Sequence, residues 1–438
     1  MRGLTRSHWL LGLGVLLAIP VVIGRTARAD INTDEPGSII VFPKVVANGE
    51  RDTVIHLTNT SNMNLGVHCF YTNAYSTCEN DPNTVCTSDL GCQDPNDPND
   101  VCIPRWEAFD FDINLTPQQP TFWRVSTGRA SDVFATPCTG STTCSCTVGA
   151  GGGLSCPGFT STLGAFTPAQ GEQFIGELRC YEVDPLDPDS LQPMAFNKLK
   201  GEAFLETLDS GEISAYNAIT VQANTSLEGG LNDDLDLFLN RVNMGNGEYN
   251  ACAESISFTS HGLDDDAAIL NTGGEVDTEM TLVPCSFIES EPVPVQVTIL
   301  SYDQIEGRNS QSLDFPCYFS ERMSNPNLSF LWDADSNPDA QFTKTEFVVN
   351  QGTLCWTGEF KGESCNTNAD CEGAIELPNS NSGLILGCLP APGVFGVHEE
   401  FYSQGERPEG SAAASMYNHG AKDTDDLMIV NDLGGGGD

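Results

Sequence analysis

The chain has few basic residues. Lys and Arg number 19 against 61 Asp and Glu, which gives a formal net charge of −42. Nucleic-acid binding depends on basic side chains that neutralise phosphates, and attachment to an anionic membrane surface has the same requirement. The composition therefore argues against both partners. It favours solubility, calcium binding or a saline environment, and a solvated acidic surface is the simplest explanation of the charge.

The sequence also lacks a recognisable catalytic motif. It has neither a G-x-S-x-G nucleophile elbow nor a glycine loop of the phosphate-binding type. His398-Glu399-Glu400-Phe401-Tyr402 begins like the zinc-binding H-E-x-x-H, but Tyr402 stands where the second histidine belongs. Adjacent side chains on a strand point to opposite faces, so we interpret Glu399 and Glu400 as a solvated acid pair. We therefore predict a protein that is not an enzyme.

Histidine is scarce and closely spaced cysteine pairs are nearly absent. The chain has six histidines, and only Cys144 and Cys146 lie close together, without a C-x-x-C or C-x-x-C-H pattern. Zinc sites usually combine C-x2-C pairs with histidines, and covalent haem needs C-x-x-C-H. Disulfides are the favoured interpretation of the cysteines, and zinc is the alternative.

Long apolar runs are missing after residue 24. Before it, Trp9–Gly24 is apolar, follows Arg2 and Arg6, and precedes the small-x-small pattern Ala27-Arg28-Ala29. We expect residues 1–29 to be a secretory signal peptide, because the run is short for a membrane anchor and contains Pro20. Its removal leaves 61 acidic against 15 basic residues. We expect a soluble protein of the periplasm or the exterior, with no membrane span in the mature chain.

What the chain does contain is a series of short β-type segments. They are rich in β-branched residues, alternate in polarity and are separated by Gly, Pro, Asn and Asp, and no long stretch has helical periodicity. The segment 236–242 fits a strand or a helical turn. The expected strands are 38–46, 53–58, 65–72, 109–115, 121–126, 174–183, 203–208, 215–223, 255–260, 278–283, 294–302, 312–319 and 342–349.

This pattern predicts an all-β protein with two β-sandwich domains. A stretch of Gly, Asn and Asp near 224–234 is the best linker candidate, so we place the domains at 30–224 and 225–438. Asp52-Thr53 and Asp277-Thr278 each lead into a strand, a turn and a second strand, which indicates two sandwiches of related construction. The similar segments 283–287 and 315–319 are expected to hold equivalent places.

The segment Asp52–Thr72 (DTVIHLTNTSNMNLGVHCFYT) contains two strands joined by Asn59-Thr60-Ser61-Asn62, which predicts a β-hairpin. In this segment the first sandwich resembles the immunoglobulin-like modules that are common in bacterial envelope proteins. The resemblance implies immunoglobulin-like sandwiches and, by analogy, a role in adhesion, assembly or spacing.

Seventeen cysteines are the sharpest feature, and such density is typical of an oxidising compartment. Twelve form three clusters in polar stretches, and the first and third clusters share a C-x5-C segment that is flanked by outer cysteines. We predict that each cluster is a loop insertion closed by two disulfides, with the pairing left open. The clusters are Cys78, Cys86, Cys92 and Cys102; Cys138, Cys144, Cys146 and Cys156; and Cys355, Cys365, Cys371 and Cys388.

The other five cysteines lie in strand-like segments. We predict a disulfide between Cys69 and Cys180, and a second between Cys252 and either Cys285 or Cys317. Because the total is odd, at least one thiol is unpaired or bonded to another molecule. Self-assembly through this odd cysteine is therefore an expectation of the sequence.

One acidic segment has the spacing of a calcium loop. Asp333, Asp335, Asn337 and Asp339 provide alternate oxygen ligands, the arrangement that wraps a hard cation. Pro338 replaces the EF-hand glycine, so we expect a looser calcium site, with a polar turn as the alternative. Weaker candidates of the same kind are Asp264, Asp265, Asp266, Asp423, Asp425 and Asp426.

These observations predict a secreted, non-catalytic protein of the bacterial envelope or exterior that serves structure, adhesion or assembly, with a protein or glycan surface as partner. The first alternative is a calcium-dependent carbohydrate-binding protein, and the second a secreted glycan hydrolase with an unrecognised acid pair. Tryptophans supply a sugar-stacking face in the first alternative, although strand tryptophans are more often core residues. They are Trp106, Trp123, Trp332 and Trp356.

Overall fold

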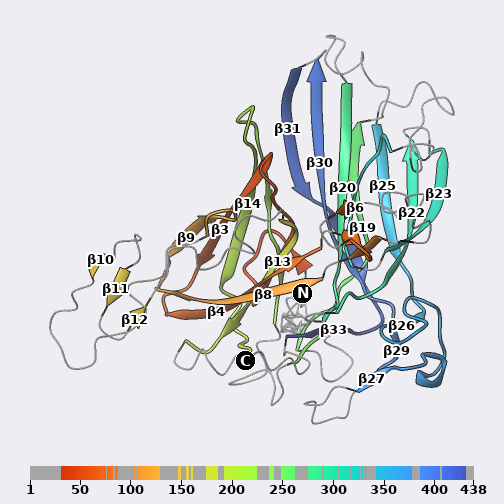
Figure 1. The fold of residues 1–438 in the computed structure, drawn as a ribbon, viewed down its shortest axis with the longest axis horizontal. Coiled ribbons are helices and arrows are strands. Elements are labelled where there is room, and N and C mark those ends of the chain that lie inside the picture. The colour runs from red at the N-terminus through yellow and green to blue at the C-terminus, as the bar shows by residue number, and fades with distance from the viewer. Residues whose placement is uncertain are drawn as a thin grey trace, which may run out of the picture.

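The computed structural model is an all-β protein (Figure 1). Its described residues form strands and a short 3-10 helix, η4 (Asn368–Asp370), with no α-helix among them, and no described helix is suited to crossing a membrane. The described residues are 31–430 except 75, 82–83, 87–99, 101, 105, 129–146, 149–153, 157–158, 161–173, 186–191, 224–235, 241–247, 262–274, 289–290, 304–305, 316, 326–327, 329–330, 332–341, 377–384 and 405–406.

Ten strands of the first half form one hydrogen-bonded sheet that folds into two layers, joined where Ala47 pairs with Asp52. Layer A has the order β15-β14-β3-β9, with β15 (Ile213–Asn217), β14 (Leu199–Thr207), β3 (Arg51–Asn59) and β9 (Pro120–Arg124). Layer B has the order β1-β16-β2-β13-β4-β8, with β1 (Ile31–Asn32), β16 (Ile219–Val221), β2 (Ile39–Ala47), β13 (Phe174–Val183), β4 (Leu65–Asn73) and β8 (Glu107–Leu115).

The first core lies between layers A and B. Ile55 and Leu57 of β3 point inward and are buried, whereas Val54 and His56 point outward. This alternation follows from the two-residue period of β structure. Strand β4 is buried along its whole length, because its inner face meets this core and its outer face meets the second half of the chain.

The predicted hairpin of 53–58 with 65–72 is wrong. Strand β3 pairs with β14 and β9 in layer A, and β4 pairs with β13 and β8 in layer B. The connecting turn carries the chain from one layer to the other, and the Asn59 side chain closes it by donating to the Met63 carbonyl at 2.7 Å. Crossing over buries the apolar rows of both strands in one core. The immunoglobulin-like resemblance rested on this hairpin and stays a prediction.

The second half forms another pair of layers around a second core. Layer C has the order β31-β30-β20-β24, with β31 (Arg407–Ser415), β30 (Val394–Gln404), β20 (Glu275–Pro284) and β24 (Phe319–Arg322). Layer D has the order β32-β19-β25-β22-β23, with β32 (Tyr417–Ala421), β19 (Ala253–His261), β25 (Phe342–Val349), β22 (Val295–Asp303) and β23 (Arg308–Phe315).

Layer B packs on layer C, and β15 of layer A also lies beside β31 of layer C, where Ser415 Oγ donates to the Asn217 carbonyl. Outward side chains of layer B, including Val41 and Tyr181, share a buried cluster with Phe395 of β30. Phe70 of β4 stacks on Phe287 with ring centroids 4.5 Å apart. A small sheet extends this core with β18 (Tyr249–Asn250), β17 (Asp236–Asn240), β33 (Asp426–Ile429) and β21 (Phe287–Ile288), so 236–240 is a strand.

The two sandwiches repeat one topology of nine strands. In chain order, β2, β3, β4, β8, β9, β13, β14, β15 and β16 correspond to β19, β20, β22, β23, β24, β25, β30, β31 and β32, with the same antiparallel neighbours in each layer. Layer A therefore corresponds to layer C, and layer B to layer D. The predicted equivalence of 283–287 and 315–319 is wrong, because β20 lies in layer C and β23 in layer D.

A shared polar contact supports this correspondence. In each sandwich an aspartate on the second strand binds the arginine and the serine of an Arg-x-Ser segment. The serine Oγ lies 2.5 and 2.7 Å from the aspartate Oδ2, and the arginine Nη1 lies 3.4 and 3.5 Å from it. The sets are Asp52, Arg124 and Ser126, and Asp277, Arg322 and Ser324.

The cysteine clusters are insertions between these framework strands. Their short strands are β5 (Ser76–Cys78), β6 (Val85–Cys86), β7 (Cys102–Pro104), β10 (Thr147–Val148), β11 (Leu154–Cys156), β12 (Phe159–Thr160), β26 (Thr353–Cys355), β27 (Ile375–Glu376), β28 (Ile385–Leu386) and β29 (Cys388–Pro390). Every sheet lies wholly on one side of residue 224, but one core is shared across it. The division into two domains stays a prediction.

Candidate functional site: a buried ionic network between the sandwiches

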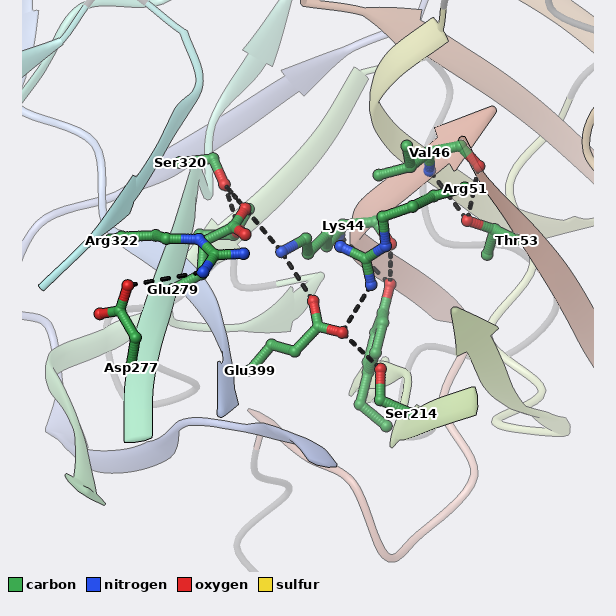
Figure 2. A network of polar contacts seen from close by, with 12 residues as sticks. Lys44, Val46, Arg51, Thr53, Ser214, Asp277, Glu279, Ser320, Arg322 and Glu399 are labelled. Carbon is green, nitrogen blue, oxygen red and sulfur yellow. Dashed lines mark hydrogen bonds and ion pairs between the residues drawn. The ribbon is translucent and has the colours of Figure 1, made fainter. Parts of the chain in front are cut away.

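The main polar site lies where layers B and C meet, and Lys44 is at its centre (Figure 2). Strand β2 is otherwise apolar around Lys44, and the lysine is buried with it. Its ammonium Nζ lies 2.7 Å from Oε1 of Glu279 on β20 and 2.9 Å from Oε2 of Glu399 on β30. One cation of the first sandwich thus joins two carboxylates of the second.

Further donors also bind these two carboxylates. Oε1 of Glu399 accepts from Nη2 of Arg51 and from Oγ of Ser214, each at 2.5 Å. Oε1 of Glu279 also accepts from Oγ of Ser320 at 2.7 Å. A buried charge is tolerated when it is paired and its lone pairs are satisfied, and the fully buried Glu399 meets both conditions.

Tyr216 of β15 holds the backbone at Lys44. Its hydroxyl donates to the Lys44 carbonyl at 2.6 Å, and the Lys44 N–H donates to the same hydroxyl at 3.2 Å. Burial raises the pKa of Tyr216, so this hydroxyl keeps its proton. The contact fixes β2 at the residue whose side chain enters the network.

A second buried pair extends the contact between layers B and C. Arg179 and Glu177, both on β13 and both fully buried, form two parallel hydrogen bonds of 3.0 and 2.9 Å. Arg179 also donates to the carbonyls of Cys285 and Pro284 at the end of β20. Its guanidinium lies 5.1 Å from the ring centre of Phe287, so the cation is covered on one face by an aromatic side chain.

The interface is balanced in charge. The first sandwich contributes three cations and one carboxylate, and the second sandwich contributes two carboxylates. Removing one member of such a buried set leaves a charge without compensation, which makes the set a strict determinant of how the two sandwiches fit. The six residues are Lys44, Arg51, Arg179, Glu177, Glu279 and Glu399.

The network holds its carboxylates in the ionised form. Burial alone raises the pKa of Glu279, but Lys44, Ser320 and Arg51 outweigh it and lower the pKa to about 2. Burial also raises the pKa of Glu399, but the charges of Lys44 and Arg51 outweigh it, so the pKa of Glu399 is lowered as well. A general acid needs a pKa near the working pH. This carboxylate pair is therefore suited to holding the sandwiches together rather than to transferring protons.

Stability should fall in acid through Glu279. The pKa of Glu279 is about 2 in the folded protein and 4.5 in the unfolded reference. The ionised Glu279 therefore stabilises the fold fully above pH 4.5, and this stabilisation is lost as the pH falls towards 2. The full contribution is about 3 kcal/mol. Chemical unfolding between pH 6 and pH 3 should show a smaller loss of stability for Glu279→Gln than for wild type. Parallel curves would contradict this role.

Eight of the seventeen cysteines form four disulfides whose two partners are both described. Cys252 bonds Cys285, and Cys317 is the one free cysteine in the described part of the chain. Cys317 is only 1% exposed, so in this fold its thiol does not reach another molecule, and assembly through it is not supported. The disulfides are Cys69–Cys180, as predicted, Cys252–Cys285, Cys355–Cys371 and Cys365–Cys388.

The third cysteine cluster is closed by two disulfides, as predicted. Its bonds join the first cysteine to the third and the second to the fourth, and Cys355, Cys365 and Cys371 form a small buried cluster of their own. In the first cluster, Cys78 is disulfide-bonded and lies opposite Cys102 in the pairing of β5 with β7. Cys92, Cys138, Cys144 and Cys146 lie outside the described residues, and for Cys86, Cys102 and Cys156 the described part is the backbone.

The predicted calcium ligands Asp333, Asp335, Asn337 and Asp339 also lie outside the described residues, as do the weaker candidates at 264–266. Of the other weak candidates, Asp426 is fully buried and binds Nζ of Lys422 at 3.1 Å. It also accepts from Ser286 Oγ and Gly393 N–H, both at 2.8 Å. Its oxygens are engaged within the fold, so the interpretation of Asp426 as a calcium ligand is wrong.

Two interpretations of exposed groups also need correction. Glu399 is fully buried rather than solvated, although Glu400 does point to the opposite face, where it meets His261 at 3.1 Å. The three described tryptophans do not form a sugar-stacking face, because they are core residues. They are Trp106, Trp123 and Trp356, whereas Trp332 lies outside the described residues.

The basic half of this network was not predicted from the sequence. Its signal was a charged residue inside an apolar strand: Lys44 in IIVFPKVVA, and Glu177 with Arg179 in FIGELRCYEV. Lys, Arg and Glu are almost never fully buried unless they are paired, so such positions indicate an internal ion pair. No protein-family model matches the chain, and no curated protein sequence matches it. The functional argument therefore rests on the fold and the network.

Proposed function

We propose that this is a secreted, non-catalytic protein of the bacterial envelope or its exterior, with a structural, adhesive or assembly role. The observation that carries the proposal is the charge-balanced network between the two sandwiches. It commits six ionisable groups to holding the sandwiches in one arrangement. Such a body presents fixed surfaces to a partner, which is what an assembly component requires.

Three further observations support the proposal. Four disulfides are fully described, and such bonds are typical of an oxidising compartment. The net charge of −42 keeps separate molecules apart until salt or a divalent cation screens it. The carbohydrate-binding alternative is weakened, since the described tryptophans are in the core.

Native mass tests this function directly. We expect the mature protein to exceed the mass of one chain in light scattering when calcium or salt screens its charge. Association should persist after thiol alkylation, because Cys317 is buried. A single-chain mass at every concentration, with calcium, chelator or high salt, would contradict an assembly role through self-association. Glycan-array binding that is lost in chelator would favour the carbohydrate-binding alternative.

A further inference from the structure

The outer faces of layers A and C correspond in topology, but the face of layer C is buried inside the molecule and the face of layer A is exposed. Asp52 and Asp277 hold the same place, so His56 on β3 corresponds to Thr281 on β20. Thr281 is fully buried by the adjoining sandwich, whereas the His56 side chain is 40% exposed. The second sandwich thus covers its face inside the molecule, and the first sandwich leaves the matching face open.

The open face of layer A carries an aromatic row. Phe122 of β9, His56 of β3 and Phe204 of β14 lie side by side, with ring centroids 5.7 and 4.8 Å apart. Phe122 is 70% exposed. In layer C the places of Phe122 and Phe204 are held by Ser320 and Glu399, which belong to the ionic network. An exposed aromatic row across three strands is typical of a surface that binds another molecule.

What covers layer C identifies the occupant of layer A. Layer C is covered mainly by layer B, and the counterpart of layer B in the second sandwich is layer D, which packs on the other face of layer C. We propose that layer D of a second copy of this chain docks on layer A, repeating between molecules the contact that layers B and C make within one. This inference rests on the proposed assembly function and names its surfaces.

The outer face of layer D has the complementary chemistry. Tyr302 of β22 lies between two cations, with Arg308 Cζ 5.9 Å and Lys344 Nζ 5.7 Å from its ring centre. Tyr417 of β32 adds a second aromatic side chain, 70% exposed. Lys44 of layer B likewise supplies a cation to the internal contact.

Layer A supplies the opposite charge. Glu202 and Glu206 flank its aromatic row, as Glu279 and Glu399 lie on layer C. The polarity of the internal contact, with cations on one layer and carboxylates on the next, is therefore present between molecules as well. Electrostatic complementarity of this kind sets the orientation of docking more than its strength.

The expected assembly is an open head-to-tail chain. The two faces differ and belong to different sandwiches, so each molecule has one face of each kind to offer. Such heterologous contacts produce rings when the rotation closes and filaments when it does not. The large negative charge opposes the contact at low ionic strength, so association should strengthen with added salt.

Two substitutions test the faces separately. Phe122→Asp on layer A and Tyr417→Asp on layer D should each weaken self-association, followed by sedimentation velocity at 0.5 M NaCl, by about 30-fold or more. Met63→Asp is the matched control, because Met63 is exposed in the turn between β3 and β4 and belongs to neither face. Thermal unfolding checks that each variant is folded.

Mixing the variants gives the decisive result. Phe122→Asp keeps an intact layer D and Tyr417→Asp keeps an intact layer A, so an equal mixture should recover dimers but no longer chains. Association of wild type that neither substitution weakens, or a mixture that stays monomeric, would overturn this inference and leave the assembly function standing. Wild type that is monomeric throughout would overturn both. Glycan binding by a monomer, lost in Phe122→Asp, would replace the second copy by a carbohydrate.

Discussion

Lys44→Ala is expected to lower the free energy of unfolding by about 3–5 kcal/mol, one of the two largest effects of any change proposed for this protein. The substitution leaves Glu399 fully buried with only Arg51 as a cationic partner, and removes the nearest cation from Glu279. The loss comes mostly from carboxylates that stay buried without compensation. Urea unfolding, with the midpoint and slope compared with wild type, measures it.

Lys344→Ala is the matched control. Lys344 is half-exposed on layer D, and its Nζ lies 3.4 Å from Glu346. An exposed ion pair contributes about 0–1 kcal/mol, so this variant should unfold close to wild type. Adding Glu399→Gln to Lys44→Ala should recover part of the loss, because it removes the stranded charge. Equal losses for the two lysine variants would show that burial is not what makes the network important.

Removing the Cys69–Cys180 disulfide is expected to cost about 4–5 kcal/mol by the chain-entropy relation. The bond joins β4 to β13 in the middle of layer B and links residues 111 apart in sequence. Without it, the unfolded chain gains the freedom of a long loop. The double variant Cys69→Ala/Cys180→Ala should therefore unfold at a clearly lower urea concentration.

Cys317→Ala separates the cross-link from the loss of a buried sulfur. Cys317 is buried in the core between layers B and C but is not in a disulfide. Its replacement creates a small cavity without freeing any loop, so it should cost much less than the double variant. Equal destabilisation by the two changes would mean that packing, and not the covalent link, accounts for the effect of Cys69–Cys180.

The strands were predictable from the sequence because their signal is local. The alternation of Val54, Ile55, His56 and Leu57 is visible in the sequence and reappears as exposed and buried faces of β3. The Cys69–Cys180 pair was predicted because each cysteine lies in an apolar strand, which placed both in one core. The all-β class, the stapled third loop and the related construction of the halves follow from the same kind of local pattern.

Strand pairing was not predictable in the same way. The Asn59 turn fits both a hairpin and a crossover, because a turn fixes the direction of the chain but not the layer it enters. Pairing depends on which apolar faces bury most surface together, and this depends on strands such as β13 and β14 that are more than 100 residues away. The repeated nine-strand order became visible only when the pairings were known.

The sequence by itself determined the composition, the acidic charge, the strand positions and the odd cysteine. Tertiary structure alone decided that Lys44, Glu279 and Glu399 meet and that Phe122 stays exposed. The physical reason is that burial and ion pairing depend on distances between residues hundreds of positions apart. Lys44 and Glu399 are 355 residues apart along the chain and 2.9 Å apart in the fold.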